Sequence, residues 1–275
     1  MGSHRTVGIL AIKTFTICFR LLKRLKSLAC NDTSKATQKA RPMKSNKENN
    51  SSAAGDRMKI KVSNNGPYLV SGGIPLIKKE IRNDSEGYCS SWHEVMTYPL
   101  KEQFALCRCG QSKTKPFCDG MHTKIHFDGK ETADDTPYLE KAERIDGPTL
   151  SMTDADGMCV HARFCMRAGG IWNLIRQSDN PEAREIAVEE AGNCPSGRLV
   201  VYDNQSGEAL EPEFEKSIVI IEYPPRDEHG PLWVRGGIPV EAADGQVYEI
   251  RNRMTLCRCG ESCNKPFCDG SHVKR

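Results

Sequence analysis

The two ends of the chain carry short apolar runs that are typical of β-strands. Residues 59–62 (KIKV) and 218–222 (IVIIE) are brief, rich in β-branched side chains, and associated with Gly-Pro and Gly-Gly-Ile-Pro segments. Segments of this kind break strands and form turns. We therefore expect both ends of the chain to fold as small β-rich units.

Between these ends the pattern changes to longer segments with helical character. Residues 171–177 and 181–191 are the two predicted helices, and Asn180 and Pro181 mark the start of the second. Residues 198–203 (RLVVYD) have the composition of a further strand. The chain as a whole is thus predicted to be an α+β protein, with a mixed module between two β-rich units.

The chain also repeats itself. Residues 66–76 (GPYLVSGGIPL) return at 230–240 as GPLWVRGGIPV, and residues 106–122 (LCRCGQSKTKPFCDGMH) return at 256–272 as LCRCGESCNKPFCDGSH. Duplication on this scale indicates two units of like fold that pack against each other. We call residues 107–122 the first loop and residues 257–272 the second loop.

The first 57 residues differ from the rest. Residues 1–30 are basic, with no acidic side chain before Asp32, and four of their six basic residues share one face of a helical wheel, namely Lys13, Arg20, Lys23 and Arg24. This predicts an amphipathic surface helix or an organelle transit peptide. The alternative is an unstructured extension, with Met58 opening the folded protein. Residues 31–57 have the composition of a disordered linker.

Composition narrows the classes of function. The 13 cysteines are odd in number and gather beside histidines, which favours metal ligands in a reducing compartment over a disulfide scaffold. A net charge of +3 gives no reason to expect a nucleic-acid partner. The sequence contains no apolar run of about 18 residues, so no membrane-spanning helix is predicted.

Each loop brings together donors of the right kind for a metal. In the second loop these are Cys257, Cys259, Cys268 and His272, with a turn-forming Pro266 between the second and third cysteines. Three thiolates and an imidazole suit either a tetrahedral zinc ion or a two-iron cluster. Structural zinc loops more often use Cys-x2-Cys, so the Cys-x-Cys spacing favours iron.

Both loops resemble the CDGSH iron–sulfur domain of the NEET proteins, whose pattern is C-x-C-x2-[ST]-x3-P-x-C-D-G-[STA]-H. The second loop fits at every position, and the first departs only at Met121, beside its histidine. The resemblance implies one [2Fe-2S] cluster in each loop, with two cysteines on the inner iron and a cysteine and a histidine on the outer one. The implied ligands are Cys107, Cys109, Cys118 and His122 in the first loop and Cys257, Cys259, Cys268 and His272 in the second.

A histidine ligand has two chemical consequences. Replacing an anionic thiolate by a neutral imidazole raises the reduction potential. An imidazole can also take up a proton, which would weaken its bond to iron, so acid is expected to release the cluster. Both properties suit electron transfer or the transfer of a cluster to another protein. The resemblance to proteins in which single-loop chains pair as dimers also implies an intramolecular pseudo-dimer of the two units.

The middle module carries three further cysteines, Cys159, Cys165 and Cys194. Their order is similar to that of a divergent single-cluster ferredoxin-like domain, although the central cysteine of the ferredoxin run is replaced by Ala162. Three cysteines suit a [3Fe-4S] cluster, whereas a [4Fe-4S] cluster needs another ligand, for which His161 is the nearest candidate. The alternative is that the three cysteines are buried core residues.

The predicted organisation is a leader and linker, a first CDGSH domain (58–127), a ferredoxin-like domain (128–216) and a second CDGSH domain (217–275). It predicts a protein of electron or cluster transfer that acts on a redox partner or an apo-acceptor protein, without being an enzyme. A redox enzyme or enzyme subunit and a zinc-stabilised interaction module are the alternatives. Because this domain order resembles prokaryotic members of the group, we expect a cytoplasmic protein. A transit peptide would instead make it mitochondrial, and the basic leader could contact a membrane.

Overall fold

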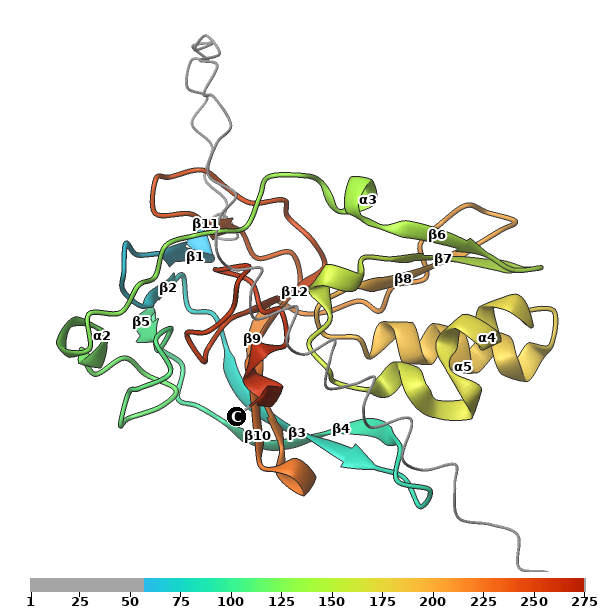
Figure 1. Cartoon of the computed structure of the whole chain (residues 1–275), viewed down its shortest axis with the longest axis horizontal. Coiled ribbons are helices and arrows are strands. Elements are labelled where there is room, and N and C mark those ends of the chain that lie inside the picture. The colour runs from blue at the N-terminus through green and yellow to red at the C-terminus, as the bar shows by residue number, and fades with distance from the viewer. Residues whose placement is uncertain (1–56, 275) are drawn as a thin grey trace, which may run out of the picture. The chain divides into compact units, whose positions relative to one another are not determined.

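The computed structural model describes residues 57–274 of the chain (Figure 1). The predictions made for the basic leader and the linker lie, apart from Arg57, outside the described residues. Within the described part of the chain, no helix is both long and apolar enough to cross a bilayer.

The described chain folds into strands, short helices and 3-10 turns. The strands are β1 (Lys59–Val62), β2 (Tyr68–Ser71), β3 (Leu76–Asn83), β4 (Cys89–Thr97), β5 (Gln103–Leu106), β6 (Glu143–Asp146), β7 (Leu150–Asp154), β8 (Leu199–Asp203), β9 (Ser217–Tyr223), β10 (Glu228–Arg235), β11 (Val240–Glu241) and β12 (Arg253–Leu256). The helices are α2 (Met121–Lys124), α3 (Tyr138–Lys141), α4 (Ile171–Arg176) and α5 (Pro181–Gly192). The 3-10 turns are η2 (Asp156–Met158), η3 (Phe164–Gly169), η4 (Pro224–Arg226) and η5 (Ser271–Lys274).

The two repeats exchange strands. One sheet has the order β11-β1-β2-β5 and the other has the order β12-β10-β9-β3-β4. In the first sheet, β11 of the second repeat pairs in parallel with β1, and in the second sheet, β3 of the first repeat pairs in parallel with β9. Figure 1 shows the same exchange, with the cyan β3 lying against the orange strands. Each sheet is therefore built by both repeats, and neither repeat completes a sheet by itself.

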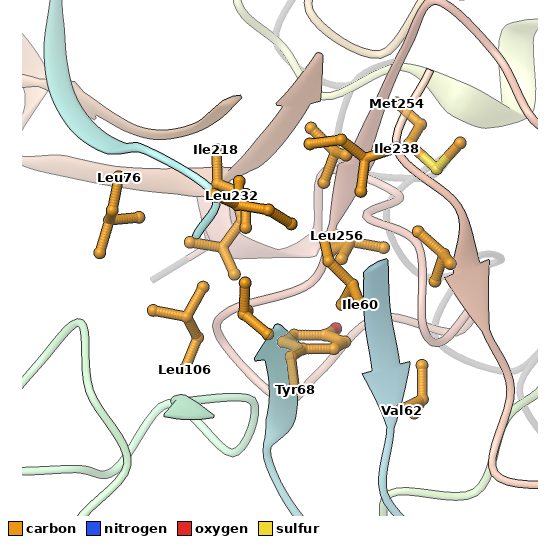
Figure 2. Close-up of a cluster of buried hydrophobic side chains, with 14 of the residues drawn as sticks. Ile60, Val62, Tyr68, Leu76, Leu106, Ile218, Leu232, Ile238, Met254 and Leu256 are labelled. Atoms are coloured by element: carbon orange, nitrogen blue, oxygen red, sulfur yellow. The ribbon is translucent and has the colours of Figure 1, made fainter. Parts of the chain in front are cut away.

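A single hydrophobic core lies between the two repeats, as Figure 2 shows. Ile60, Tyr68 and Leu106 come from the first repeat and pack with Leu232 and Leu256 of the second, all at most 1% exposed. Burying side chains of this size stabilises a fold by about 1.5–3 kcal/mol each relative to leaving them in water. Because this burial is shared, the strand exchange and the core hold both loops in one body.

The middle module is a separate three-stranded antiparallel sheet, β6-β7-β8, covered by α4 and α5. The predicted helices and the predicted strand all appear, as α4, α5 and β8. Asn180 caps α5 as expected, because its side-chain oxygen accepts hydrogen bonds from the backbone N–H groups of Glu182 and Ala183. The α+β class is thus confirmed, whereas the exact domain limits remain predictions.

Candidate metal centres

In the first loop the four expected ligands form two pairs. The sulfur atoms of Cys107 and Cys109 are 3.8 Å apart, and Cys118 Sγ lies 3.3 Å from His122 Nδ1. Metal–sulfur bonds of about 2.3 Å in a tetrahedral site put neighbouring sulfurs about 3.8 Å apart. Each pair therefore has the separation expected of two ligands on one metal ion.

The second loop repeats this arrangement. Its cysteine pair, Cys257 and Cys259, has a sulfur–sulfur distance of 3.6 Å, and Cys268 Sγ lies 3.4 Å from His272 Nδ1. Within residues 57–274, no three His, Cys, Asp or Glu side chains gather around a point suited to a single ion. The residues that the sequence predicted as ligands thus form two close pairs in each loop.

Backbone contacts fix the shape of each loop. In the first loop, Asp119 accepts hydrogen bonds from the N–H groups of Lys113 and Met121, at 2.8 and 3.0 Å. The N–H of Gly120 points to Cys118 Sγ at 3.5 Å, and this glycine has a φ of 83°, which a residue with a side chain rarely adopts. The second loop makes the same contacts through Asp269 and Gly270. The Cys-Asp-Gly sequence therefore fixes the orientation of the third cysteine's sulfur atom in each loop.

The histidines of the two loops differ in exposure. His122 is half-buried, whereas His272 is 8% exposed and Cys268 is 3% exposed. Burial lowers the pKa of His272 to about 4 and raises the pKa of the Cys268 thiol well above its usual value. A thiol buried in this way can remain a thiolate only if a cation compensates its charge, which a bound iron would do.

The paired cysteines of the second loop show how the backbone prepares a thiolate. A hydrogen bond from Cys259, opposed by burial and assisted by the N–H groups of Ser262 and Gly260, lowers the pKa of Cys257 to about 6. The pKa of Cys259 moves the opposite way because it donates this bond and is itself partly buried. Without a metal the pair therefore shares one proton, and a metal that binds both sulfurs would displace it.

A buried arginine lies between the paired cysteines of each loop, and the sequence analysis did not predict its role. Arg108 is 1% exposed, and its guanidinium donates to the carbonyl oxygens of Gly129 (2.5 Å) and Ser63 (3.2 Å). It also lies over the ring of Tyr68 at 5.7 Å. The Cys-Arg-Cys sequence occurs in both repeats, but this pattern does not show that the arginine side chain is buried.

Arg258 anchors the second loop through different partners. It donates to the Gly230 carbonyl at 2.9 Å and pairs with Glu222 at 2.9 Å. Both arginines lie between the two cysteines that would hold the inner iron. The charge of Arg258 is met by Glu222, so that of Arg108 is the one that would offset the negative charge of thiolate ligands.

The three cysteines of the middle module also lie near one another. We call Cys159, Cys165 and Cys194 the middle site. The neighbouring Cys194 and Cys159 add to burial in raising the pKa of Cys165 to about 12. Burial opposes ionisation of Cys159, but hydrogen bonds from His161 outweigh it and lower the pKa of Cys159 to about 7. In the middle site, the Cys159 thiol therefore ionises readily, whereas the Cys165 thiol needs a cation to compensate its charge before it ionises.

A buried carboxyl group that the sequence analysis missed lies beside the middle site. Glu190 is 1% exposed, neither of its carboxylate oxygens has a hydrogen-bond partner, and burial raises its pKa to about 8. Its nearest cation, Arg167, has its Nε 3.8 Å away and is held by Glu189 at 2.6 Å. Glu190 precedes Cys194 by four residues, one helical turn, and its charge contributes to the raised pKa of Cys165. A buried carboxyl group without a hydrogen-bond partner would suit a site that has only three cysteines.

Comparison with known families agrees with this geometry. Residues 65–123 and 229–273 match the iron-binding zinc finger of CDGSH type, and residues 145–204 match a divergent 4Fe-4S mono-cluster domain. The chain is therefore an iron–sulfur cluster-binding protein. Two CDGSH-type regions thus flank a divergent 4Fe-4S mono-cluster region, which is the domain order that the sequence predicted. No curated protein and no solved structure matches the chain.

Proposed function

We propose that the chain holds a [2Fe-2S] cluster in each loop and a third cluster in the middle site, and that it transfers electrons or clusters to another protein. The observation that carries this proposal is the pairing of ligands in both loops, with separations of 3.3–3.8 Å. The cysteine pair would hold one iron, and the Cys–His pair would hold the other. When bound, such clusters supply one-electron redox chemistry at a potential that the histidine ligand raises.

The surrounding residues give the two loops different tasks. The half-buried His122 leaves the first loop open to a partner protein. The buried His272 and Cys268 keep solvent away from the second loop. We therefore propose that the first loop is the place of exchange and that the second loop retains its cluster.

The arrangement of the two repeats supports the proposed intramolecular pseudo-dimer. A Cβ atom on Gly110 would collide with the carbonyl of Cys259, and one on Gly260 would lie 2.8 Å from the carbonyl of Cys109. The loops thus approach each other reciprocally, at two glycines with positive φ. The Tyr68 hydroxyl adds a further link, at 2.7 Å from the carbonyl of Cys257 in the other repeat.

For the middle site we propose a [4Fe-4S] cluster with Glu190 as its fourth ligand. Replacing Glu190 with Ala removes the only carboxyl group placed there without a hydrogen-bond partner among residues 57–274. Iron should then fall from about eight to about seven atoms per chain, and the oxidised protein should show the EPR signal of a [3Fe-4S] cluster. Glu189→Ala is the matched control, because Glu189 is exposed and should leave the iron content unchanged. Equal iron in both variants would rule out Glu190 as a ligand.

A transfer assay tests the proposed function and separates its two forms. The loaded chain, reduced with dithionite and mixed with an oxidised one-electron acceptor protein, should regain its oxidised spectrum while keeping its iron. Mixed with an apo-ferredoxin, it should lose iron from the first loop and not from the second. A chain that passes neither electrons nor iron to these acceptors would contradict a carrier function.

A further inference from the structure

The middle site and the second loop touch at one point. A Cβ atom on Gly270 would lie 2.5 Å from Cδ2 of His161, 2.9 Å from its Nε2 and 2.8 Å from the carbonyl oxygen of Cys159. Gly270 stands between Cys268 and His272, the proposed outer-iron ligands. The absence of a side chain on Gly270 therefore allows a histidine of the middle module to lie directly against the second loop.

The opposite edge of the same imidazole faces the middle site. His161 Nδ1 lies 4.0 Å from Cys159 Sγ. The space lined by His161 and His272 amounts to about 10 Å³, which is no more than a single water molecule needs. The ring of His161 thus lies between Cys159, a proposed ligand of the middle site, and Gly270, which stands between two proposed ligands of the second loop.

The chain holds this contact in place at some cost. His161 and Arg163 both have positive φ, 57° and 66°, a conformation that non-glycine residues rarely adopt. Arg163 makes two hydrogen bonds, of 2.8 and 2.9 Å, to the carboxylate of Glu228 on β10. This partly buried ion pair fastens the strained ligand segment to the second CDGSH unit.

The first loop has no such neighbour. Gly120 corresponds to Gly270 and has almost the same φ, 83° against 82°, but a Cβ atom there would meet nothing within 4 Å. The first loop instead contacts the second through the reciprocal approach of Gly110 and Gly260. The three sites therefore follow one another in contact, from the middle site to the second loop and then to the first.

We propose that this order is an internal electron relay, in which His161 connects the middle site to the second loop through Gly270. One electron passes from the reduced middle site to the oxidised second site, no bond is made or broken, and no proton needs to move. The electron enters from a one-electron donor, for which dithionite stands in below, and leaves through the first loop, whose histidine is half-buried rather than buried. The relay deepens the proposed function and rests on it, because it requires loaded clusters.

A pair of matched glycine substitutions tests the relay in the full, loaded chain. Gly270→Ala and Gly87→Ala both place alanine at a φ between 82° and 88°, so both pay a similar backbone penalty, but only the first forces His161 away, and Gly87 lies outside both loops. Gly270→Ala should slow the transfer of an electron from the middle site to the second loop severalfold, measured by rapid mixing with limiting dithionite. Gly87→Ala should leave that rate unchanged. Equal rates in both variants would overturn the relay.

A second variant and a second readout keep the test decisive if Gly270→Ala does not fold. His161→Gly removes the bridging ring and suits the positive φ, so it should fold and show the same slower transfer. EPR power saturation of the wild-type second loop should show faster spin relaxation than that of the first, and emptying the middle site with Cys165→Ser should abolish the difference. Equal relaxation in the two loops with all three sites loaded would contradict the relay. A colourless protein would instead refute the proposed function itself.

Discussion

The first loop should lose its cluster at a higher pH than the second. An imidazole that ligates iron must remain neutral, and a proton from solvent reaches a half-buried ring more readily than a buried one. Burial lowers the pKa of His272 to about 4, so this ring stays neutral between about pH 6.5 and pH 4. The half-buried His122 does not have this degree of burial. We expect the two midpoints of cluster loss to differ by about one pH unit or more.

Variants that can hold a cluster in only one loop allow the loss of each cluster to be followed separately. Cys118→Ser leaves the second loop and Cys268→Ser leaves the first, each combined with Cys165→Ser to empty the middle site. Visible absorbance against pH should show earlier acid bleaching in the chain that retains the first loop. In that chain, His122→Cys should move the loss to lower pH, because a thiolate ligand replaces the imidazole. Coincident midpoints would show that burial of the histidine does not control loss of the cluster.

The lowered pKa of His272 also makes the stability of the metal-free fold depend on pH. As the pH falls from about 6.5 towards 4, the unfolded chain takes up a proton that the folded, metal-free chain resists. The metal-free fold should therefore lose stability across this window and be more stable above it. A metal bound to His272 would add stability to the folded state and make its unfolding more pH-dependent.

Replacing Arg108 with Leu should remove the first cluster and destabilise the whole fold. The substitution leaves the buried carbonyl of Gly129 without its donor, at a cost of about 1–3 kcal/mol, whereas the Ser63 carbonyl keeps the N–H of Gly66. It also removes the cation that lies over Tyr68. We expect a loss of about 2–4 kcal/mol in the free energy of unfolding, measured by urea denaturation, and loss of about two iron atoms per chain.

Two variants control for this effect. Arg258→Leu should remove the second cluster and spare the first, because Arg258 anchors the second loop. Arg82→Leu breaks an exposed ion pair with Glu80 and should change stability by less than about 1 kcal/mol. If Arg108→Leu kept both its iron and its stability, the buried arginine would not be needed to hold the loop.

The sequence predicted those features that local chemistry determines. The strand at 59–62 and the capped helix at Pro181 appear because alternation, β-branched side chains and an asparagine cap act within a few residues. The ligand pairs follow in the same way from the Cys-x-Cys and Cys-x3-His spacings. For these features the outcome depends little on the rest of the fold.

Features that depend on distant contacts could not be predicted. The exchange of β3 and β11 joins strands from the two ends of the chain, and no local pattern fixes the partner of a buried strand. Glu190 and Glu189 are adjacent and identical in type, and only packing against the middle site buries one of them. His161 was noted as a candidate fourth ligand, but its contact with Gly270 depends on how two modules meet.

The content of iron and acid-labile sulfide in the purified chain tests the central claim most directly. Two [2Fe-2S] clusters and one [4Fe-4S] cluster predict about eight iron atoms and about eight sulfides per chain, with visible absorbance. About four of each would leave the middle site without a cluster. A colourless protein that contains zinc and no labile sulfide would contradict the account.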